Sequence, residues 1–270
     1  MSLVNTALLF GGGIVTGTIG AMLGIGGGVF LIPFLVLVTG IPMHQAIATS
    51  IVAVIATSSA GASMNLERQT VNVRLGMALE IATVAGAILG GITANYLSGN
   101  VLSKIFAFLL LAVSLFMIRR LRQGNTEAQI SGEGLFPAQF KDDASGKIVS
   151  YAVRRLPGAL GVSLVAGNIS GLLGVGGGIF KVPAMHLLSG VPMKAATATS
   201  NFMIGVTAAA SAFIYFGNGH LNPQIASAAA VGVLAGSMLG IRLGRKIHST
   251  RLTWIFALML LLISIRMFFR

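Results

Sequence analysis

Apolar segments long enough to cross a lipid bilayer recur from one end of this chain to the other. A membrane-spanning helix needs about 20 mostly apolar residues, and the chain holds about ten apolar pieces, several of that length. Hydrophobic residues make up 55% of the 270 residues and charged residues only 9%, whereas an ordinary soluble domain is about 25% charged. So few charges could not cover the surface of a soluble protein of this size. The sequence therefore predicts an all-α, polytopic integral membrane protein.

The chain is also internally duplicated. The glycine-rich stretch 17–28 returns at 167–178, Pro33 returns as Pro183, and the Ala-Thr-Ser string at 48–50 returns at 198–200. The members of each pair are 150 positions apart, and a constant offset without gaps indicates a structural repeat. We therefore predict a first transmembrane repeat at 1–119 and a second at 158–270.

The stretch between the repeats, 120–157, has a different composition. It holds most of the acidic residues in the chain, namely Glu127, Glu133, Asp142 and Asp143. Acidic side chains are costly in hydrocarbon, so we predict that this stretch is a polar linker on the cytoplasmic side of the membrane.

Each repeat is predicted to hold about five hydrophobic segments. In the first repeat they are 3–23, 29–40, 44–64, 75–97 and 101–119. In the second they are 158–173, 179–190, 194–216, 224–244 and 251–269.

Basic residues cluster in the short loops between these segments, and their placement predicts the orientation. Each repeat crosses the membrane five times, or three times if its first two segments form a re-entrant hairpin. Both counts are odd, so the second repeat enters the membrane upside down, and placing the basic loops inside predicts two inverted repeats with both chain termini outside. A parallel repeat needs an even count and would scatter the basic residues over both sides. The net charge of +12 then follows the positive-inside rule, and we predict no nucleic-acid partner. The bases assigned to the cytoplasmic side are Arg68, Arg74, Arg119, Arg120, Arg122, Arg154, Arg155, Lys194, Arg245, Lys246 and Arg251.

A glycine-rich break interrupts an apolar segment at the same place in each repeat. Consecutive glycines disfavour a continuous helix by about 1 kcal/mol each, and the apolar piece that follows is too short to span a bilayer. We therefore predict a broken or re-entrant segment in each repeat, buried in protein or lining a wet cavity. A pair of such breaks at matching positions points to the central site of a transporter. The glycines predicted to bind substrate are Gly24, Gly26, Gly27, Gly28, Gly174, Gly176, Gly177 and Gly178.

The chemistry expected at the breaks is anion binding. A helix that starts just after the glycines directs free N–H groups and the positive end of its dipole at the break. The alternative is that the glycines only allow close helix packing, which we favour for Gly86 and Gly90. A nucleotide-binding loop is disfavoured, because the flanks are apolar and no P-loop lysine follows.

Polar residues in apolar segments add candidates. Lys181 could bind the anion directly or extend to the membrane interface. Glu80 could pair with Lys181, lie near the headgroups, or carry a coupling proton, and it is our coupling-ion candidate. Hydroxyl and amide groups early in the long helices could donate to the anion, or they could cap the helix or bond back to its backbone. They are Thr49, Ser50, Thr199, Ser200 and Asn201.

No catalytic constellation is visible. The chain has no cysteine, and no paired carboxylates, nucleophile–base pair or metal-ligand spacing stands out. The sequence therefore predicts a protein that is not an enzyme and that needs no cofactor or metal.

These motifs resemble those of the TauE/SafE sulfite exporter family, also called the toluene sulfonate uptake permeases. The resemblance rests on the two Gly-x-Gly-Gly-Gly breaks, the prolines Pro33 and Pro183, and the two Ala-Thr-Ser strings, and it covers all but the linker. It implies a multi-pass permease of a bacterial-type cytoplasmic membrane. It also implies a small sulfur-containing anion as substrate, such as sulfite or an organosulfonate, moved by alternating access.

Several alternatives stay open at this point. The substrate could be another small anion such as a carboxylate, the protein could be a channel, and a membrane scaffold without transport is a further reading. The sequence does not fix the direction of transport, coupling to protons or sodium, or the oligomeric state, for which a homodimer is one option. Besides lipid, the predicted partner is a small anionic substrate.

Overall fold

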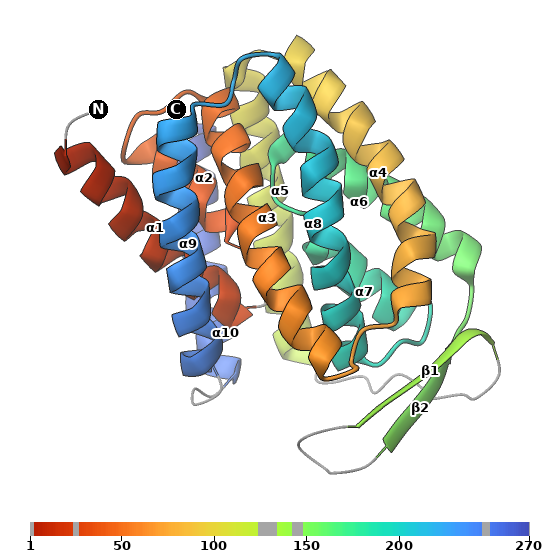
Figure 1. The fold of residues 1–270 in the computed structure, drawn as a ribbon. Helices are drawn as coiled ribbons and strands as arrows, with labels where there is room; N and C mark the ends of the chain where they lie inside the picture. Colours follow the sequence, from red (N-terminus) through yellow and green to blue (C-terminus); the bar gives the residue numbers. More distant parts are fainter. Residues whose placement is uncertain (1–2, 24–26, 124–133, 142–147, 245–248, 270) are drawn as a thin grey trace.

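The computed structural model describes residues 3–23, 27–123, 134–141, 148–244 and 249–269. It is a helical bundle with a two-stranded hairpin at one end (Figure 1). The first half holds α1 (Leu3–Leu23), α2 (Gly28–Leu37), α3 (Met43–Glu67), α4 (Val73–Tyr96) and α5 (Gly99–Gln123). The second half holds α6 (Leu156–Leu173), α7 (Gly178–Leu187), α8 (Met193–Gly217), α9 (Pro223–Gly244) and α10 (Ser249–Phe268).

Every predicted apolar segment is a helix in the structure, which confirms the polytopic all-α class. Within the described ranges, 7 helices are long and apolar enough to cross a membrane. The helices α2 and α7 have 10 residues each, and about 15 Å of helix spans only half a bilayer. Each half therefore contains one short helix directly after its glycine-rich break.

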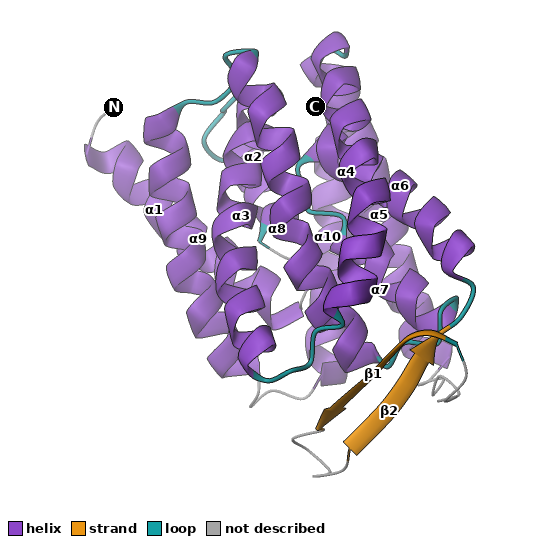
Figure 2. Cartoon of the chain, turned by 45° about the vertical axis from the view of Figure 1, so that its right-hand side comes forward, coloured by secondary structure: helices purple, strands orange, loops and turns teal. Residues whose placement is uncertain are grey.

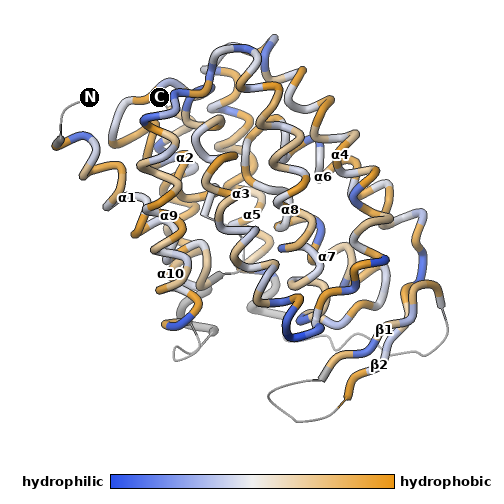
Figure 3. Tube along the Cα trace, in the orientation of Figure 1, coloured by the Kyte–Doolittle hydropathy of each residue, from blue (hydrophilic) through white to orange (hydrophobic). Residues whose placement is uncertain are grey.

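The outer surface of the bundle fits a lipid environment. Large apolar side chains of the long helices point outward, as Ile81 of α4 and Phe213 of α8 do with 78% of their surface exposed. Hydrophilic segments gather mainly at the ends of the bundle (Figure 3). Apolar surface of this extent would not be stable in water.

Helix packing follows the repeat. Helix α1 packs against α9, and α6, its counterpart, packs against α4. The helix pairs α3–α8 and α5–α10 each join one helix to its own counterpart. Exchanging the two halves therefore leaves the packing pattern unchanged, and each half completes its core only against the other.

The connections lie where an inverted repeat would put them. The turn from α3 to α4 is at the hairpin end of the bundle, whereas the turn from α8 to α9 is at the opposite end (Figure 1). Helix α1 begins and α10 ends toward that opposite end. The sidedness of these ends relative to a membrane stays a prediction.

A β-hairpin inside the predicted linker is the element that the sequence analysis did not anticipate. Strands β1 (Leu135–Lys141) and β2 (Ile148–Val153) pair antiparallel, and Figure 2 shows them as the only strands among the described residues. One side of the hairpin carries Phe140 and Tyr151, which are 6% and 3% exposed. The hairpin is therefore docked on the helices and not free in water.

Glycines bring the backbones of α4 and α6 into contact. A Cβ atom on Gly90 would lie 2.0 Å from the carbonyl oxygen of Asn168, and one on Gly171 would lie 2.1 Å from that of Ala87. Such distances leave no room for a side chain, because the obstacle is rigid backbone. This confirms the close-packing interpretation of Gly86 and Gly90.

We predict that Gly171→Val lowers the stability of the bundle by about 3 kcal/mol or more, since the added atoms meet backbone that cannot move aside. The matched control is Gly11→Val on α1, where nothing lies within 4 Å of the new Cβ. Thermal unfolding in detergent measures both. Equal melting temperatures for the two variants would contradict the packing described for α4 and α6.

Candidate functional site

The break of the second half is built by glycines in a backbone conformation that other residues rarely adopt. Gly174, Gly176 and Gly177 have φ angles of +66°, +79° and +69°, in the left-handed region that favours glycine. Helix α6 ends at Leu173 and α7 begins at Gly178. In the first half, Gly27 has φ −66° before α2, while Gly24 and Gly26 lie outside the described residues.

The two breaks meet where α3 and α8 cross. A Cβ on Gly176 would lie 3.2 Å from Val54 of α3 and 2.9 Å from Ile204 of α8. Val54 and Ile204 occupy the same position in the two repeats, and they also adjoin Gly28 and Gly178, at 3.0 Å and 2.8 Å. The long central helix α3 therefore contacts the first residue of α2, and α8 contacts the first residue of α7.

Ser50 ties the two halves together at this point. Its hydroxyl donates a hydrogen bond of 2.8 Å to the carbonyl oxygen of Gly174 in the opposite repeat. A Cβ on Gly28 would lie 2.6 Å from the same hydroxyl and 2.9 Å from the same carbonyl. The start of α2 thus lies directly against the break that precedes α7.

Ser200 of α8, the counterpart of Ser50, lies against the first residue of α7. Its Oγ would be 3.3 Å from a Cβ on Gly178, and the residue is 1% exposed. Among the described residues this Oγ has no hydrogen-bond partner, and neither has the Oγ1 of Thr49, which is 0% exposed. An unpaired buried hydroxyl costs about 1–3 kcal/mol, so these two groups point to a ligand or an alternative conformation.

The remaining predicted hydroxyl and amide groups have protein neighbours. Thr199 accepts a hydrogen bond of 3.0 Å from the backbone N–H of Asn72. Asn201 is turned toward α3, where its Nδ2 would lie 3.8 Å from a Cβ on Gly61. Helices α3 and α8 are preceded by Pro42 and Pro192 without a side-chain cap, so the capping alternative does not describe these residues.

The first turns of α2 and α7 keep donors facing the breaks. Neither helix has a side-chain hydrogen bond at its cap, which is Gly27 for α2 and Gly177 for α7. The first backbone N–H groups of a helix have no partner within the helix. Two uncapped helix starts therefore converge on Ser50 and Ser200, and this is a suitable geometry for an anion.

Lys181 and Glu80 form a buried ion pair bridged by Thr207. The Lys181 ammonium donates to the Thr207 Oγ1 at 3.0 Å, and that hydroxyl donates to Glu80 Oε1 at 2.6 Å. The second carboxylate oxygen, Oε2, is 3.8 Å from the Lys181 Nζ. Lys181 is only 1% exposed, so the alternative in which its ammonium extends to the membrane interface is wrong, and the predicted pairing with Glu80 is confirmed.

Thr207 is the member of this group that sequence reasoning missed. It follows Ser200 by seven residues on α8, so both lie on one face of the helix. That spacing, together with a counterpart at Thr57 in the first repeat, is the signal that could have identified it. Across the described ranges, no cluster of three or more His, Asp or Glu residues that could hold a metal ion is present.

Comparison with known proteins gives a consistent result. The family model described as sulfite exporter TauE/SafE matches residues 9–267. A probable membrane transporter protein of Bacillus subtilis, YunE, is 27% identical over 264 residues, covering 95% of each chain. A probable membrane transporter protein of Haemophilus influenzae is 28% identical over 245 residues, covering 91% of this chain and 86% of its own. No solved structure matches this chain.

We predict that breaking the ion pair is costly, whereas removing it whole is not. Lys181→Leu alone or Glu80→Ala alone leaves one buried charge without its partner and should destabilise the protein by about 3–5 kcal/mol. The double variant places at each position the residue that stands at the matching position of the other repeat, which is Leu31 for Lys181 and Ala230 for Glu80, and it should recover most of the loss. Thermal unfolding of the three variants measures this, and additive losses would contradict the pairing.

Proposed function

Because this chain belongs to the TauE/SafE sulfite exporter family, we propose that it is a secondary transporter for a small sulfur-containing anion such as sulfite or an organosulfonate. The chain is a membrane transporter by family, and the anion and the mechanism are our inference. Its action is binding and translocation without covalent chemistry.

One observation carries the proposal. The hydroxyls of Thr49 and Ser200 are buried without partners among the described residues, and Ser200 adjoins the uncapped start of α7 at Gly178. A sulfonate or sulfite group presents several acceptor oxygens and a negative charge, and backbone N–H groups together with hydroxyls satisfy both. A carboxylate has the same needs with fewer oxygens, so it is the alternative substrate.

The site is closed in this conformation. Gly28, Ser50 and Gly174 are in direct contact, so an anion would enter when the two short helices move apart. Because each short helix packs mainly against helices of its own half, rocking one half against the other would open the breaks to one side at a time. This is alternating access with the breaks at the centre.

The Lys181–Thr207–Glu80 group supplies a means of coupling. Lys181 is in the first turn of α7, where its backbone N–H bonds to the Gly177 carbonyl at 3.2 Å. If a proton or sodium ion neutralises Glu80, the ammonium loses its counter-charge and can attract the substrate anion instead. We propose that Glu80 carries the coupling ion and that the anion and the carboxylate compete for Lys181.

We predict that Ser200→Ala weakens binding of the transported anion about tenfold or more, since a hydrogen bond to a charged group is worth about 1.5–3 kcal/mol. Without ligand, the same variant should have a melting temperature no lower than that of the wild type, because the Ser200 hydroxyl makes no hydrogen bond to the described residues. The measurement is a thermal-shift titration in detergent with sulfite, thiosulfate, sulfoacetate, taurine, sulfate and acetate.

Ser237→Ala on α9 is the matched control, since Ser237 is also buried but donates to the Leu234 carbonyl of its own helix at 2.8 Å. It should keep the affinity of the wild type. Saturable stabilisation of the wild type by one sulfur anion would name the substrate class. An unchanged affinity in Ser200→Ala would refute the site, and no shift with any anion would refute the anion proposal.

A further inference from the structure

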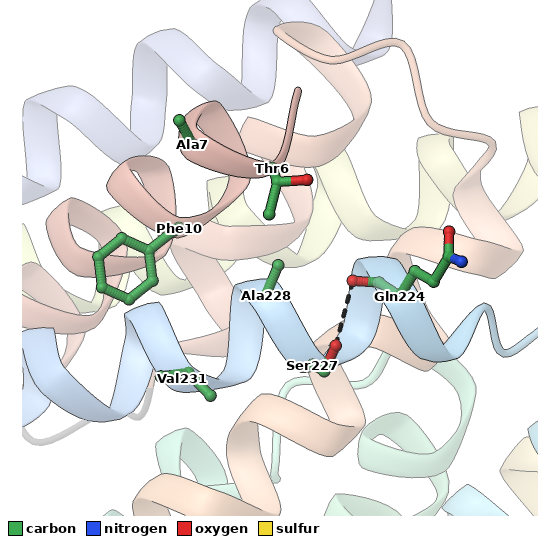
Figure 4. Close-up of a pocket in the computed structure, with 7 residues that line it drawn as sticks. All are labelled: Thr6, Ala7, Phe10, Gln224, Ser227, Ala228 and Val231. Atoms are coloured by element: carbon green, nitrogen blue, oxygen red, sulfur yellow. Dashed lines mark hydrogen bonds between the residues drawn. The ribbon is translucent and has the colours of Figure 1, made fainter. Parts of the chain in front are cut away.

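The end of the bundle opposite the hairpin is hollowed. A cavity of about 550 Å³ there is lined by Gln45, Gly219, Leu221, Asn222, Pro223 and Gln224. A neighbouring cavity of about 780 Å³ lies between α1 and α9 and shares Gln224, and Figure 4 shows side chains of both helices around it. We call the first of these the α8–α9 cavity.

The α8–α9 cavity has polar walls suited to a small anion. Gln45 and Asn222 bring side-chain amides to its lining. Thr49, with its unpaired hydroxyl, is one turn after Gln45 on α3 and is fully buried behind this lining. His220 lies next to the lining and stacks on His44 with ring centroids 4.8 Å apart. Burial and the neighbouring His44 lower the pKa of His220, so this wall offers neutral donors at neutral pH.

The repeat provides a built-in comparison for this cavity. The positions that match Gln45 and Asn222 in the other repeat are Ala195 and Asn72. Gln45 and Asn222 are partly exposed, whereas Ala195 is 0% and Asn72 5% exposed. The position of the α8–α9 cavity at one end of the bundle is therefore matched by a filled, buried position at the hairpin end.

The β1–β2 hairpin is what fills it. The Asn72 side chain donates to the Phe136 carbonyl at 3.1 Å and is hydrogen-bonded to Tyr151. Burial raises the pKa of Tyr151, so its hydroxyl stays protonated. Just after β2, the Arg154 N–H donates to the Ser189 carbonyl at 3.0 Å in the turn that follows α7.

An apolar cluster completes the contact. Phe140, Tyr151 and Val153 of the hairpin share one buried cluster with residues of four helices, including Leu79 of α4 and Met203 of α8. Leu79 precedes Glu80 in the chain, and the Met203 carbonyl is 3.1 Å from the Thr207 hydroxyl. The docked hairpin thus shares a buried cluster with two residues, Leu79 and Met203, that adjoin the Lys181–Thr207–Glu80 group.

A matching pair of threonine hydroxyls also distinguishes the hairpin end of the bundle from the cavity end. Under the hairpin, the Asn72 N–H reaches the Thr199 hydroxyl at 3.0 Å. Under the α8–α9 cavity, the matching Thr49 hydroxyl has no partner among the described residues. At the hairpin end the predicted site residue Thr199 is therefore hydrogen-bonded to the covering segment, whereas at the cavity end the predicted site residue Thr49 is not.

We propose that the β1–β2 hairpin is a removable seal over one of two equivalent entrances to the central site, and that the α8–α9 cavity is the mouth of the other entrance, uncovered in this conformation while the central site itself stays closed. A two-stranded hairpin has marginal stability by itself, so its place depends on a few docked side chains and it can leave. As a gate, the seal rests on the proposed transport function. Its undocking would expose Glu80 and Lys181 to water on that side.

Cysteine accessibility tests the seal, because the natural chain has no cysteine. Gln45→Cys and Ala195→Cys are introduced one at a time at the matching positions and treated with a charged, membrane-impermeant maleimide in detergent. We expect Q45C to label readily and A195C slowly. Adding Phe140→Ala with Tyr151→Ala should raise the labelling rate of A195C at least about tenfold, because two buried anchors are truncated, and leave Q45C unchanged.

Gln139→Ala with Ser150→Ala is the control, since these paired residues lie on the exposed side of the hairpin and should not change A195C labelling. Phe140→Ala alone is the milder variant, to be used if the double variant unfolds. It should raise the labelling rate of A195C by a smaller factor. Fast labelling of A195C with the native hairpin, or no increase on truncation, would overturn the proposal. Labelling needs no substrate, so it reads out the seal even if the anion proposal fails.

Discussion

An interrupted helix inside a bilayer exposes backbone groups where there is no water to satisfy them, and the rest of this structure depends on solving that problem. The protein solves it by placing both interruptions at the crossing of α3 and α8, with the Ser50 hydroxyl bonded to the Gly174 carbonyl of the other half. Each half needs the other to bury its break, because part of the cover comes from the opposite repeat, as Val233 does for Gly27 and Ile47 for Gly174. The duplication, the glycines and the interlocked packing are consequences of this single requirement.

The places where the repeats differ are as informative as those where they agree. Lys181 and Glu80 stand where the other repeat has Leu31 and Ala230, so one half carries a charged group beside its break and the other an apolar filling. A duplicated scaffold provides two equivalent routes to one centre, and the divergence makes them chemically distinct.

Much of the fold could be predicted from the sequence, since apolar length and the constant offset are direct consequences of the bilayer and the duplication. The glycine breaks and the Lys181–Glu80 pair were also within reach, because charges at membrane depth need partners. Thr207 could have been singled out by its spacing from Ser200, but its bond to Glu80 could not be predicted, because that bond depends on which face of α8 meets α4. The hairpin was missed because its strands are short and lie in a polar stretch, and only tertiary contact with Asn72 and its neighbours fixes them.

The hairpin also changes what the linker does. A connection between two repeats needs only to span the distance from α5 to α6, and a disordered chain would serve. This one instead places Phe140 and Tyr151 into a buried cluster with Leu79, the residue before Glu80. Because burial of the charged pair is maintained partly by an element outside the repeats, the free energy of docking the hairpin adds to the cost of hydrating Glu80 from that side. The linker therefore takes part in setting which entrance opens, and the repeats alone do not decide it.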